Sequence, residues 1–421
     1  MENRKIRVAW VCSFSNEKMR ARLTFDSGGC LKILYRLLGV TYGRGTDSAI
    51  WNTNAIEEME KIDDVELHVI CPVRGLAKKE VLYEDNGIQY YFFREQNSDL
   101  VRFVLHQLLS KYTSLYKRNR RVISQLISEI QPDIVHVMGA ENPYYSLSLL
   151  DVPSNIPTII QLQALLTRLV NVTKVKEEKK SFYYKGLMER EIIKKADYIG
   201  TTLDDFKKFI IEEIKSDAQF LDISLAMAQK INLEPSEKQY DFVYFSANIS
   251  KAGEEALESF ILAHKKNPTI TLDIVGGYDE AFRARLDARI KECGLENCVT
   301  LEGRLPSHDD VIHQIRKARF ALLPLKMDFV PNTLHEAMAN GLPVVTTITD
   351  GTPSLNAKRQ CVLLSAQNDF QAMADNMMAL LDNESLSNEL RQNAAAYEKE
   401  RSNNQSIIAK WVEEYKKLVL S

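Results

Sequence analysis

Short apolar runs alternate with longer amphipathic segments along the first half of the chain. Five runs have the length and composition of buried β-strands: Ile6–Cys12, Val65–Cys71, Ile134–Met138, Thr158–Leu162 and Tyr198–Thr201. Three of the segments between them have the length of helices: Asn54–Lys61, Leu100–Ile130 and Tyr183–Lys195. This alternation predicts a parallel α/β architecture.

The same pattern starts again in the second half, after a polar stretch at Glu234–Gln239 that suits a linker. The new strands are predicted at Asp241–Phe245, Thr271–Val275, Val299–Leu301, Phe320–Leu323 and Pro343–Thr347. We therefore expect two Rossmann-like domains that face each other across a cleft at the carboxyl ends of their strands. The predicted parts are a first domain at 1–217, a linker at 218–240, a second domain at 241–403, and a helix at 404–421 that packs back on the first domain.

Composition and charge exclude several classes of protein. The 421 residues are 45% apolar and 26% charged, which argues against a disordered, collagen-like or coiled-coil chain. A net charge of −3 gives no electrostatic reason to expect a nucleic-acid partner. Residues 1–217 carry 32 basic and 29 acidic side chains, so the remaining residues carry 22 and 28. The first half is therefore mildly basic.

The cysteines and the apolar runs bear on the compartment. The six cysteines are scattered and complete no set of zinc ligands, which is typical of free thiols in a reducing compartment. No apolar run approaches the roughly 18–20 residues that span a bilayer. The first apolar run is followed by no small-residue cleavage site, so we interpret it as a strand. These observations predict a cytoplasmic protein.

The segment from Leu323 to Thr347 carries the clearest chemical signal. Proline and asparagine at 331–332 predict a helix start, and Gly341 predicts its end. Free backbone N–H groups at such a start bind anions, helped by the helix dipole. Asp328 precedes the start and Glu336 follows it by about one turn, so two carboxylates flank a phosphate site, as a nucleotide-sugar requires. An ordinary helix with an acidic first turn is the alternative interpretation.

Several segments spread along the chain resemble segments of the retaining family 4 glycosyltransferases of the GT-B fold, and they occur in the same order as in that family. Glu336-Ala-Met-Ala-Asn-Gly-Leu-Pro-Val-Val345 resembles the second half of the family's E-x7-E motif, and Asp328 stands at its first Glu. Further segments resemble the family's K-P-D-I-V-H, E-R-x5-A-D, I-V-G-x-G and V-x-F-x-G-R-V patterns: 131–137, 189–198, 272–277 and 299–305. The ordered set covers nearly the whole chain.

The resemblance implies roles for residues of the donor site. Glu336 would hold the ribose hydroxyls, Asp328 the hydroxyls of the transferred sugar, and Lys251 the phosphate leaving group as charge develops on it. The diphosphate would lie on the backbone of the helix start. The donor-binding residues implied there are Val330, Pro331, Asn332, Thr333 and Leu334.

The resemblance also implies donor contacts outside that helix. Gly28 and Gly29 match a loop where small residues let the backbone approach the phosphates. Gly276 and Arg304 belong to segments that would line the donor, and Gln163 stands where the family often has a sugar-contacting His. The other departures from the family are Asp328, one methylene shorter than Glu, and a missing Arg before Lys251.

The reaction implied is front-face substitution with retention of configuration, with no metal and no cofactor beyond a UDP- or GDP-linked sugar. The acceptor would be a hydroxyl of a glycan or of a lipid-linked glycan. The basic runs 117–121 and 174–180 are compatible with peripheral contact with an anionic membrane, at the inner face in a cytoplasmic protein. A helix packed on the sheet with a solvated basic end is the alternative.

Four histidines are assigned no catalytic role. We expect His136 to be packed within its strand, and His308 and His313 to lie on the surface around a helix capped by Ser307. His335, next to Glu336, is left outside the site.

The predicted function is transfer of a sugar from a nucleotide diphosphate to a hydroxyl acceptor in polysaccharide or glycoconjugate biosynthesis. The alternatives are a degenerate homologue that binds nucleotide-sugars with little transfer, and a two-domain sugar-binding protein. A GT-B epimerase or phosphorylase is a third class, but no pyridoxal-type lysine context is evident in the sequence.

Overall fold

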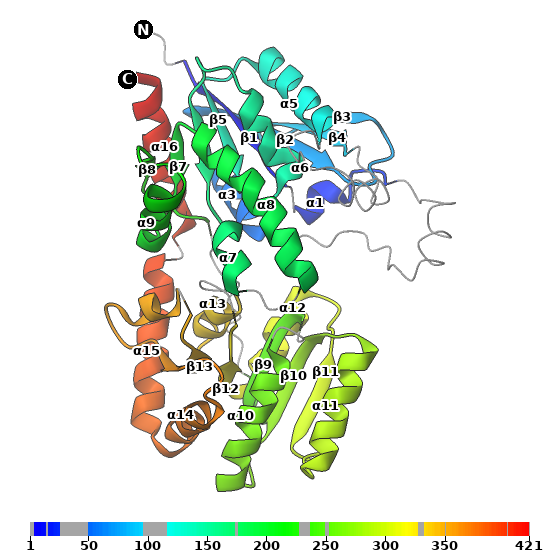
Figure 1. Cartoon of the computed structure of the whole chain (residues 1–421), viewed down its shortest axis with the longest axis vertical. Coiled ribbons are helices and arrows are strands. Elements are labelled where there is room, and N and C mark those ends of the chain that lie inside the picture. Colours follow the sequence, from blue (N-terminus) through cyan, green and yellow to red (C-terminus); the bar gives the residue numbers. More distant parts are fainter. Residues whose placement is uncertain are drawn as a thin grey trace. The chain divides into compact units, whose positions relative to one another are not determined.

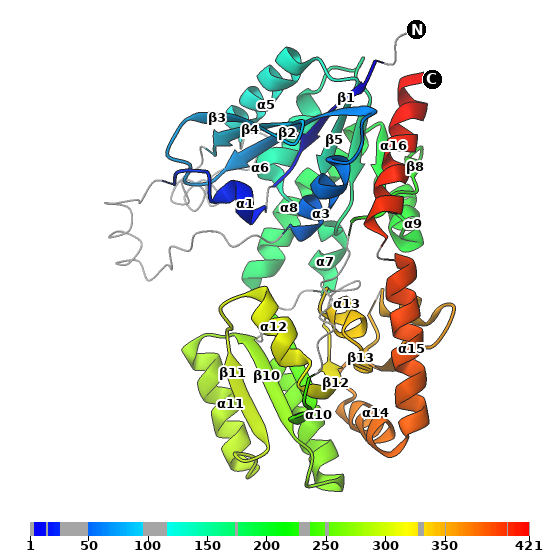
Figure 2. The same ribbon diagram turned by 180° about the vertical axis from the view of Figure 1, so that it is seen from behind.

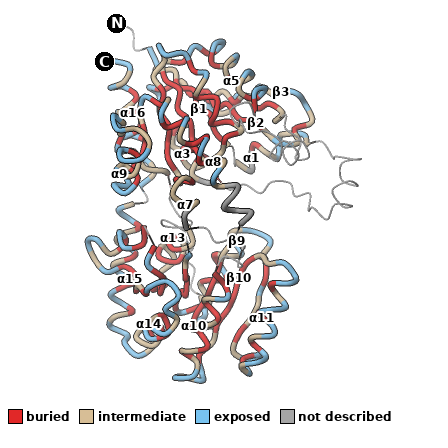
Figure 3. The backbone as a smooth tube through the Cα atoms, in the orientation of Figure 1, coloured by how far each residue is buried: buried red, intermediate tan, exposed pale blue. Residues whose placement is uncertain are grey.

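The computed structural model describes residues 4–13, 16–25, 49–95, 116–172, 176–226, 236–248, 252–326, 332–349, 351–401 and 403–420 (Figure 1). The chain forms two compact units. Met1–Ala228 and Asn403–Ser421 make up the N-terminal unit, and Gln229–Ser402 make up the C-terminal unit. Each unit has its own parallel sheet and its own buried core, and Figure 3 shows the buried residues concentrated in the strands.

The N-terminal unit is built on an eight-stranded sheet in the order β3-β4-β2-β1-β5-β6-β7-β8. Every neighbouring pair is parallel except β3 and β4, which form an antiparallel hairpin at one edge. The strands are β1 (Ile6–Val11), β2 (Val65–Val73), β3 (Glu80–Asp85), β4 (Ile88–Arg94), β5 (Ile134–Met138), β6 (Thr158–Gln161), β7 (Tyr198–Gly200) and β8 (Gln219–Leu221). β5 is buried along its whole length, as expected of a central parallel strand covered on both faces.

Helices connect these strands and cover the sheet. They are α1 (Glu17–Arg20), α3 (Ile50–Met59), α5 (Lys117–Ile130), α6 (Pro143–Ser146), the 3₁₀ helix η2 (Leu147–Asp151), α7 (Leu166–Val172), α8 (Lys176–Lys195) and α9 (Asp204–Glu213). In α5, Ile123, Ile127 and Ile130 recur at helical spacing and are buried, while the basic residues of its first turn face outward or pair with Asp151. Apolar periodicity therefore explains the docking of α5.

The last helix, α16 (Asn404–Leu420), belongs to the N-terminal unit although it follows the C-terminal unit in sequence (Figure 2). It contacts α3 and β1. Ile408, Trp411, Val412 and Tyr415 are buried in the core of the N-terminal unit, at the helical spacing seen in the sequence.

The C-terminal unit is built on a six-stranded parallel sheet in the order β11-β10-β9-β12-β13-β14. The strands are β9 (Tyr240–Asn248), β10 (Leu272–Gly277), β11 (Val299–Gly303), β12 (Ala318–Leu323), β13 (Val344–Thr347) and β14 (Val362–Ser365). The helices are α10 (Gly253–Lys266), α11 (Glu280–Glu292), α12 (His308–Ile315), α13 (Asn332–Ala339), η4 (Thr352–Asn356), α14 (Phe370–Asp382) and α15 (Glu384–Arg401). The chain order reverses between β9 and β12, which is where open α/β sheets bind ligands.

The α/β fold class with two Rossmann-like parallel sheets is confirmed, but β3, β4, β8 and β14 were not predicted as strands. The β3–β4 hairpin was not predicted, because β3 alternates exposed and half-buried residues without a continuous apolar run. β8 lies inside the segment predicted as linker, because Leu221 and Ile223 supply buried apolar side chains at the sheet edge. Of the helix predicted over 100–130, only α5 lies within the described residues.

Candidate active site

The helix α13 starts and ends close to where the sequence predicts. It begins at Asn332, and its last turn is closed by the Leu342 N–H, which donates to the Ala337 carbonyl at 3.0 Å. Gly341 adopts φ of 75°, in the left-handed region that favours glycine at a helix end. Leu334 is one of the predicted donor-binding residues. Its side chain is fully buried in the core, so only its backbone can contact a ligand.

Glu336, in the first turns of α13, has a partner that the sequence did not reveal. Its Oε1 lies 3.0 Å from Nε2 of His308, the first residue of α12. The Glu336 side chain is 13% exposed and the His308 side chain 37% exposed. His308 is partly exposed, as expected of a surface residue, but its contact with the carboxylate predicted to hold the ribose was not expected from the sequence.

The start of α12 fixes the position of His308. Ser307 Oγ accepts from the Asp310 N–H, and the Asp310 side chain accepts from the Ser307 N–H, which together form a capping box. The predicted N-cap at Ser307 is therefore confirmed. His313, one turn further along, is exposed as expected.

His335 faces away from Glu336 and is buried among residues of α15. Its Nδ1 lies 2.6 Å from Glu398 Oε1, and its ring stacks on Tyr397 with an interplanar angle of 6°. Burial lowers the pKa of His335, although the hydrogen bond to Glu398 opposes that effect. This buried pair attaches α13 to α15, which gives His335 a structural role.

The carboxyl ends of β10 and β11 carry two further predicted donor residues. Gly276 adopts φ of 141° where the pairing of β10 with β9 shifts register, so the backbone is irregular there. Arg304 directly follows β11 and is exposed. Gly303 adopts φ of 81°, and a Cβ at this position would lie 3.1 Å from the Tyr278 hydroxyl, so the turn into Arg304 favours glycine.

Gln163 follows β6 in the N-terminal unit, at the carboxyl edge of that sheet. Its Nε2 donates to the Met138 carbonyl at 3.3 Å. The amide is half-buried and uncharged, so it can bind a hydroxyl but cannot carry a proton.

Several of the predicted site residues lie outside the described part of the chain. These are the catalytic candidates Lys251 and Asp328, and the donor-binding candidates Gly28, Gly29, Val330 and Pro331. Their roles stay predictions.

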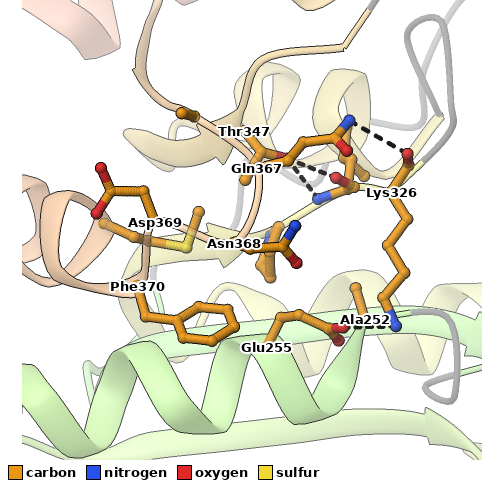
Figure 4. Close-up of a pocket in the computed structure, with 12 residues that line it drawn as sticks. Ala252, Glu255, Lys326, Thr347, Gln367, Asn368, Asp369 and Phe370 are labelled. Atoms are coloured by element: carbon orange, nitrogen blue, oxygen red, sulfur yellow. Dashed lines mark hydrogen bonds and ion pairs between the residues drawn. The ribbon is translucent and has the colours of Figure 1, made fainter.

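A small concavity lies at the carboxyl ends of β12, β13 and β14, bordered by the start of α10 (Figure 4). Lys326 Nζ lies 2.6 Å from Glu255 Oε1 across it, and Gln367 Nε2 donates to the Lys326 carbonyl at 3.2 Å. None of the predicted donor-binding residues lines it. The Lys326–Glu255 pair occupies its polar side, which leaves this concavity without an evident donor role.

Two further observations concern the described ranges alone. Within them, no three His, Cys, Asp or Glu side chains come together in a way that could hold a metal ion. Within them, too, no helix combines the length and the apolar character needed to traverse a bilayer.

Residues 228–397 match the family model described as "Glycosyl transferases group 1". The chain is 33% identical over 135 residues to WcaL of Escherichia coli strain K12, named as a colanic acid biosynthesis glycosyltransferase. It is 30% identical over 135 residues to the amylovoran biosynthesis glycosyltransferase AmsK of Erwinia amylovora. The two alignments cover 30% and 31% of this chain, and each spans 32% of the relative, about a third of its length.

A solved structure shares the fold over nearly the whole chain. The sucrose-phosphate synthase of Thermosynechococcus elongatus superposes with a TM-score of 0.65 at 16% identity, over 98% of this chain and 99% of that one. This match confirms the predicted GT-B fold.

Proposed function

We propose that this protein transfers a sugar from a nucleotide diphosphate to a hydroxyl acceptor. The match of residues 228–397 to the glycosyl transferases group 1 model supports this proposal. The acceptor is a growing polysaccharide or glycoconjugate, in line with the colanic acid and amylovoran pathways named for the two relatives. The donor binds the C-terminal unit, and the acceptor binds the N-terminal unit.

The position of Glu336 carries this proposal. Its carboxylate sits in the first turns of α13, at the switch point of the donor sheet, and inside the segment that matches the family. A carboxylate there can accept from both ribose hydroxyls, while the free N–H groups at the helix start bind the diphosphate. His308 holds the Glu336 carboxylate in place from one side, because its Nε2 lies 3.0 Å from Oε1.

The proposed chemistry is a front-face substitution with retention, without a metal ion. Lys251 and the backbone at the start of α13 stabilise charge on the departing phosphate, which accepts the proton of the acceptor hydroxyl. Asp328 orients the transferred sugar. The bond between the anomeric carbon and the phosphate oxygen breaks as the acceptor oxygen bonds to the same face of that carbon.

Stabilisation of the protein by nucleotides tests the donor assignment. We expect UDP or GDP to raise the melting temperature of the full chain, whereas Glu336→Gln removes that shift. Loss of two charge-assisted hydrogen bonds of about 1.5–3 kcal/mol each would weaken binding by at least about a hundredfold. Glu389→Gln, which changes an exposed acid on α15, is the matched control and should keep the shift.

The outcome that would refute the transferase proposal is that none of UDP, GDP, ADP or their sugars stabilises the wild-type protein. Once a donor is identified, the anomeric coupling constant of the product reports retention or inversion. Activity that persists in EDTA supports the metal-free reaction, and a strict requirement for Mg²⁺ contradicts it.

A further inference from the structure

A carboxylate that no sequence motif singles out lies at the carboxyl end of β5 in the N-terminal unit. Glu141 follows this strand by three residues and precedes α6. Its side chain folds back against Gly139, which adopts φ of 99°. A Cβ at position 139 would lie 2.4 Å from Glu141 Oε1, so this arrangement requires glycine.

The two oxygens of Glu141 differ in their surroundings. Oε1 accepts from Asn142 Nδ2 at 2.9 Å. Oε2 is withdrawn from solvent and has no hydrogen-bond partner within the part of the chain that the structure describes. A polar atom in that state is costly, since buried polar groups are nearly always hydrogen-bonded. A ligand that supplies a hydrogen-bonding group would remove this cost.

Glu189 on α8 shows what a purely structural acid in the same unit looks like. Its Oε1 accepts from the Leu166 N–H, and its Oε2 accepts from the N–H and hydroxyl of Thr167, all at 2.7–2.9 Å. Its carboxylate is thereby used in capping the start of α7. The donors to the Glu141 carboxyl are the Asn142 amide and the backbone N–H of Glu141 itself, both from the same short turn, and its Oε2 meets no donor within the described residues, so part of its hydrogen-bonding capacity is left for something else.

Burial raises the pKa of Glu141 to about 8, and the charge of Glu189 adds to that effect. The hydrogen bond from the backbone N–H of Glu141 itself, the charge of Lys185 on α8 and the hydrogen bond from Asn142 act in the opposite direction. Tyr145 of α6 is the other titratable group nearby, and its hydroxyl donates to the Met138 carbonyl. Near pH 7 the Glu141 carboxyl is therefore mainly neutral and can both donate and accept a hydrogen bond.

A second polar side chain stands at the end of the neighbouring strand. β5 and β6 pair in parallel, with Met138 opposite Gln161, and Gln163 Nε2 donates to the Met138 carbonyl. Glu141 and Gln163 therefore extend from the ends of adjacent parallel strands, where α/β sheets bind ligands. Two uncharged groups that both donate and accept match the hydroxyls of a sugar, each of which also does both.

We propose that Glu141, with Gln163 beside it, binds a hydroxyl group of the acceptor sugar. This proposal rests on the proposed function, because it takes the N-terminal unit as the acceptor side. It adds an acceptor-binding residue to a unit for which the sequence singled out no carboxylate.

Saturation-transfer difference NMR on the full chain, with methyl β-D-glucopyranoside and methyl β-D-galactopyranoside as probes, tests the proposal. We expect saturation transfer to at least one probe in the wild-type protein. Glu141→Ala should remove it, while Glu141→Gln should retain it, because an amide also donates and accepts. Glu191→Gln, which changes an exposed acid on α8, should have no effect.

The pH profile provides a test that does not depend on a variant keeping its fold. Wild-type binding should be about half lost near pH 8 and reduced about tenfold near pH 9, as the carboxyl loses its proton. In Glu141→Gln the profile should be flat over this range.

The proposal is overturned if neither glycoside binds the wild-type protein, if Glu141→Ala binds as well as wild type, or if the wild-type profile is flat between pH 6.5 and 9. Failure of the underlying transferase proposal is distinguishable, because it removes stabilisation by nucleotides. That stabilisation should be unchanged in both Glu141 variants.

Discussion

Acid should destabilise the N-terminal unit through one buried histidine. His136 on β5 pairs with Trp10 on β1 and lies against α16, where its Nδ1 is 2.6 Å from the Tyr415 hydroxyl. Trp10 Nε1 donates to the same hydroxyl at 3.0 Å, and the Trp411 ring lies 5.0 Å from the imidazole. In this arrangement the Tyr415 hydroxyl donates to a neutral His136, so the packed histidine expected from the sequence is confirmed. The three aromatic side chains around His136 carry no negative charge that could stabilise a protonated imidazole.

The size of the effect follows from the pKa of His136. Burial lowers that pKa from 6.5 to about 3, so the folded unit keeps the imidazole neutral while the unfolded chain takes up a proton below about pH 6.5. The unfolded state then binds more protons, and the free energy of unfolding falls as the pH falls. Full stability is present above about pH 6.5, and the loss between pH 7 and pH 5 amounts to about 2 kcal/mol.

Tryptophan fluorescence isolates this transition, because Trp10, Trp51 and Trp411 all belong to the N-terminal unit. Urea unfolding followed by fluorescence at pH 5 and pH 7 measures the His136 contribution as a difference between proteins, because Glu141, whose pKa is raised to about 8, acts in the opposite direction over this range in the wild type and in the His136 variants alike. Between pH 7 and pH 5 the wild-type protein should lose about 2 kcal/mol of stability relative to His136→Gln and His136→Phe, which cannot titrate, even if each variant is less stable overall.

His313→Gln, which changes an exposed histidine of the C-terminal unit, is the control and should retain the wild-type dependence on pH. The reasoning fails if the two His136 variants lose stability between pH 7 and pH 5 as steeply as the wild type.

Three further substitutions have expected costs. Glu398→Ala removes the buried hydrogen-bond partner of His335 and should destabilise the C-terminal unit by about 1.5–3 kcal/mol in calorimetry, whereas Glu398→Gln costs less and the fluorescence transition does not move in either variant. Ser307→Ala removes the cap of α12 and should lower the melting temperature of the same unit through a loss of about 1 kcal/mol, which Ser307→Thr largely avoids. Trp411→Ala should destabilise the N-terminal unit by about 3–5 kcal/mol in urea unfolding followed by the remaining tryptophans, and an unchanged midpoint would contradict the packing of α16.

The sequence predicts the parts of this molecule that depend on local pattern. Buried parallel strands such as β5 are continuous apolar runs, and the limits of α13 follow from an asparagine at its start and a glycine at its end. The cap at Ser307 is likewise a signal within four residues. Each of these features is decided by neighbours in the chain, so a linear pattern is enough to find it.

The contacts between residues far apart in the sequence depend instead on how strands and helices are ordered in space. His308 and Glu336 are 28 residues apart and meet because α12 and α13 lie near the same edge of the sheet. His335 and Glu398 are 63 residues apart and meet because α15 packs on α13. In both cases the residue types are ordinary for a helix surface, so nothing in the sequence marks them as partners.

The two buried acids of the N-terminal unit show why a motif is an uncertain guide to chemistry. Glu189 stands in the segment that resembles the family's E-R pattern, yet its carboxylate is saturated by three donors that hold the start of α7. Glu141 stands in no such pattern, yet it keeps an unpartnered oxygen within the described residues and a pKa close to neutral. A motif identifies a residue that the fold needs as readily as one that the reaction needs. The unpartnered Oε2 of Glu141 separates the two, since both oxygens of Glu189 have donors, and it is the reason for proposing Glu141 as the residue that binds a ligand.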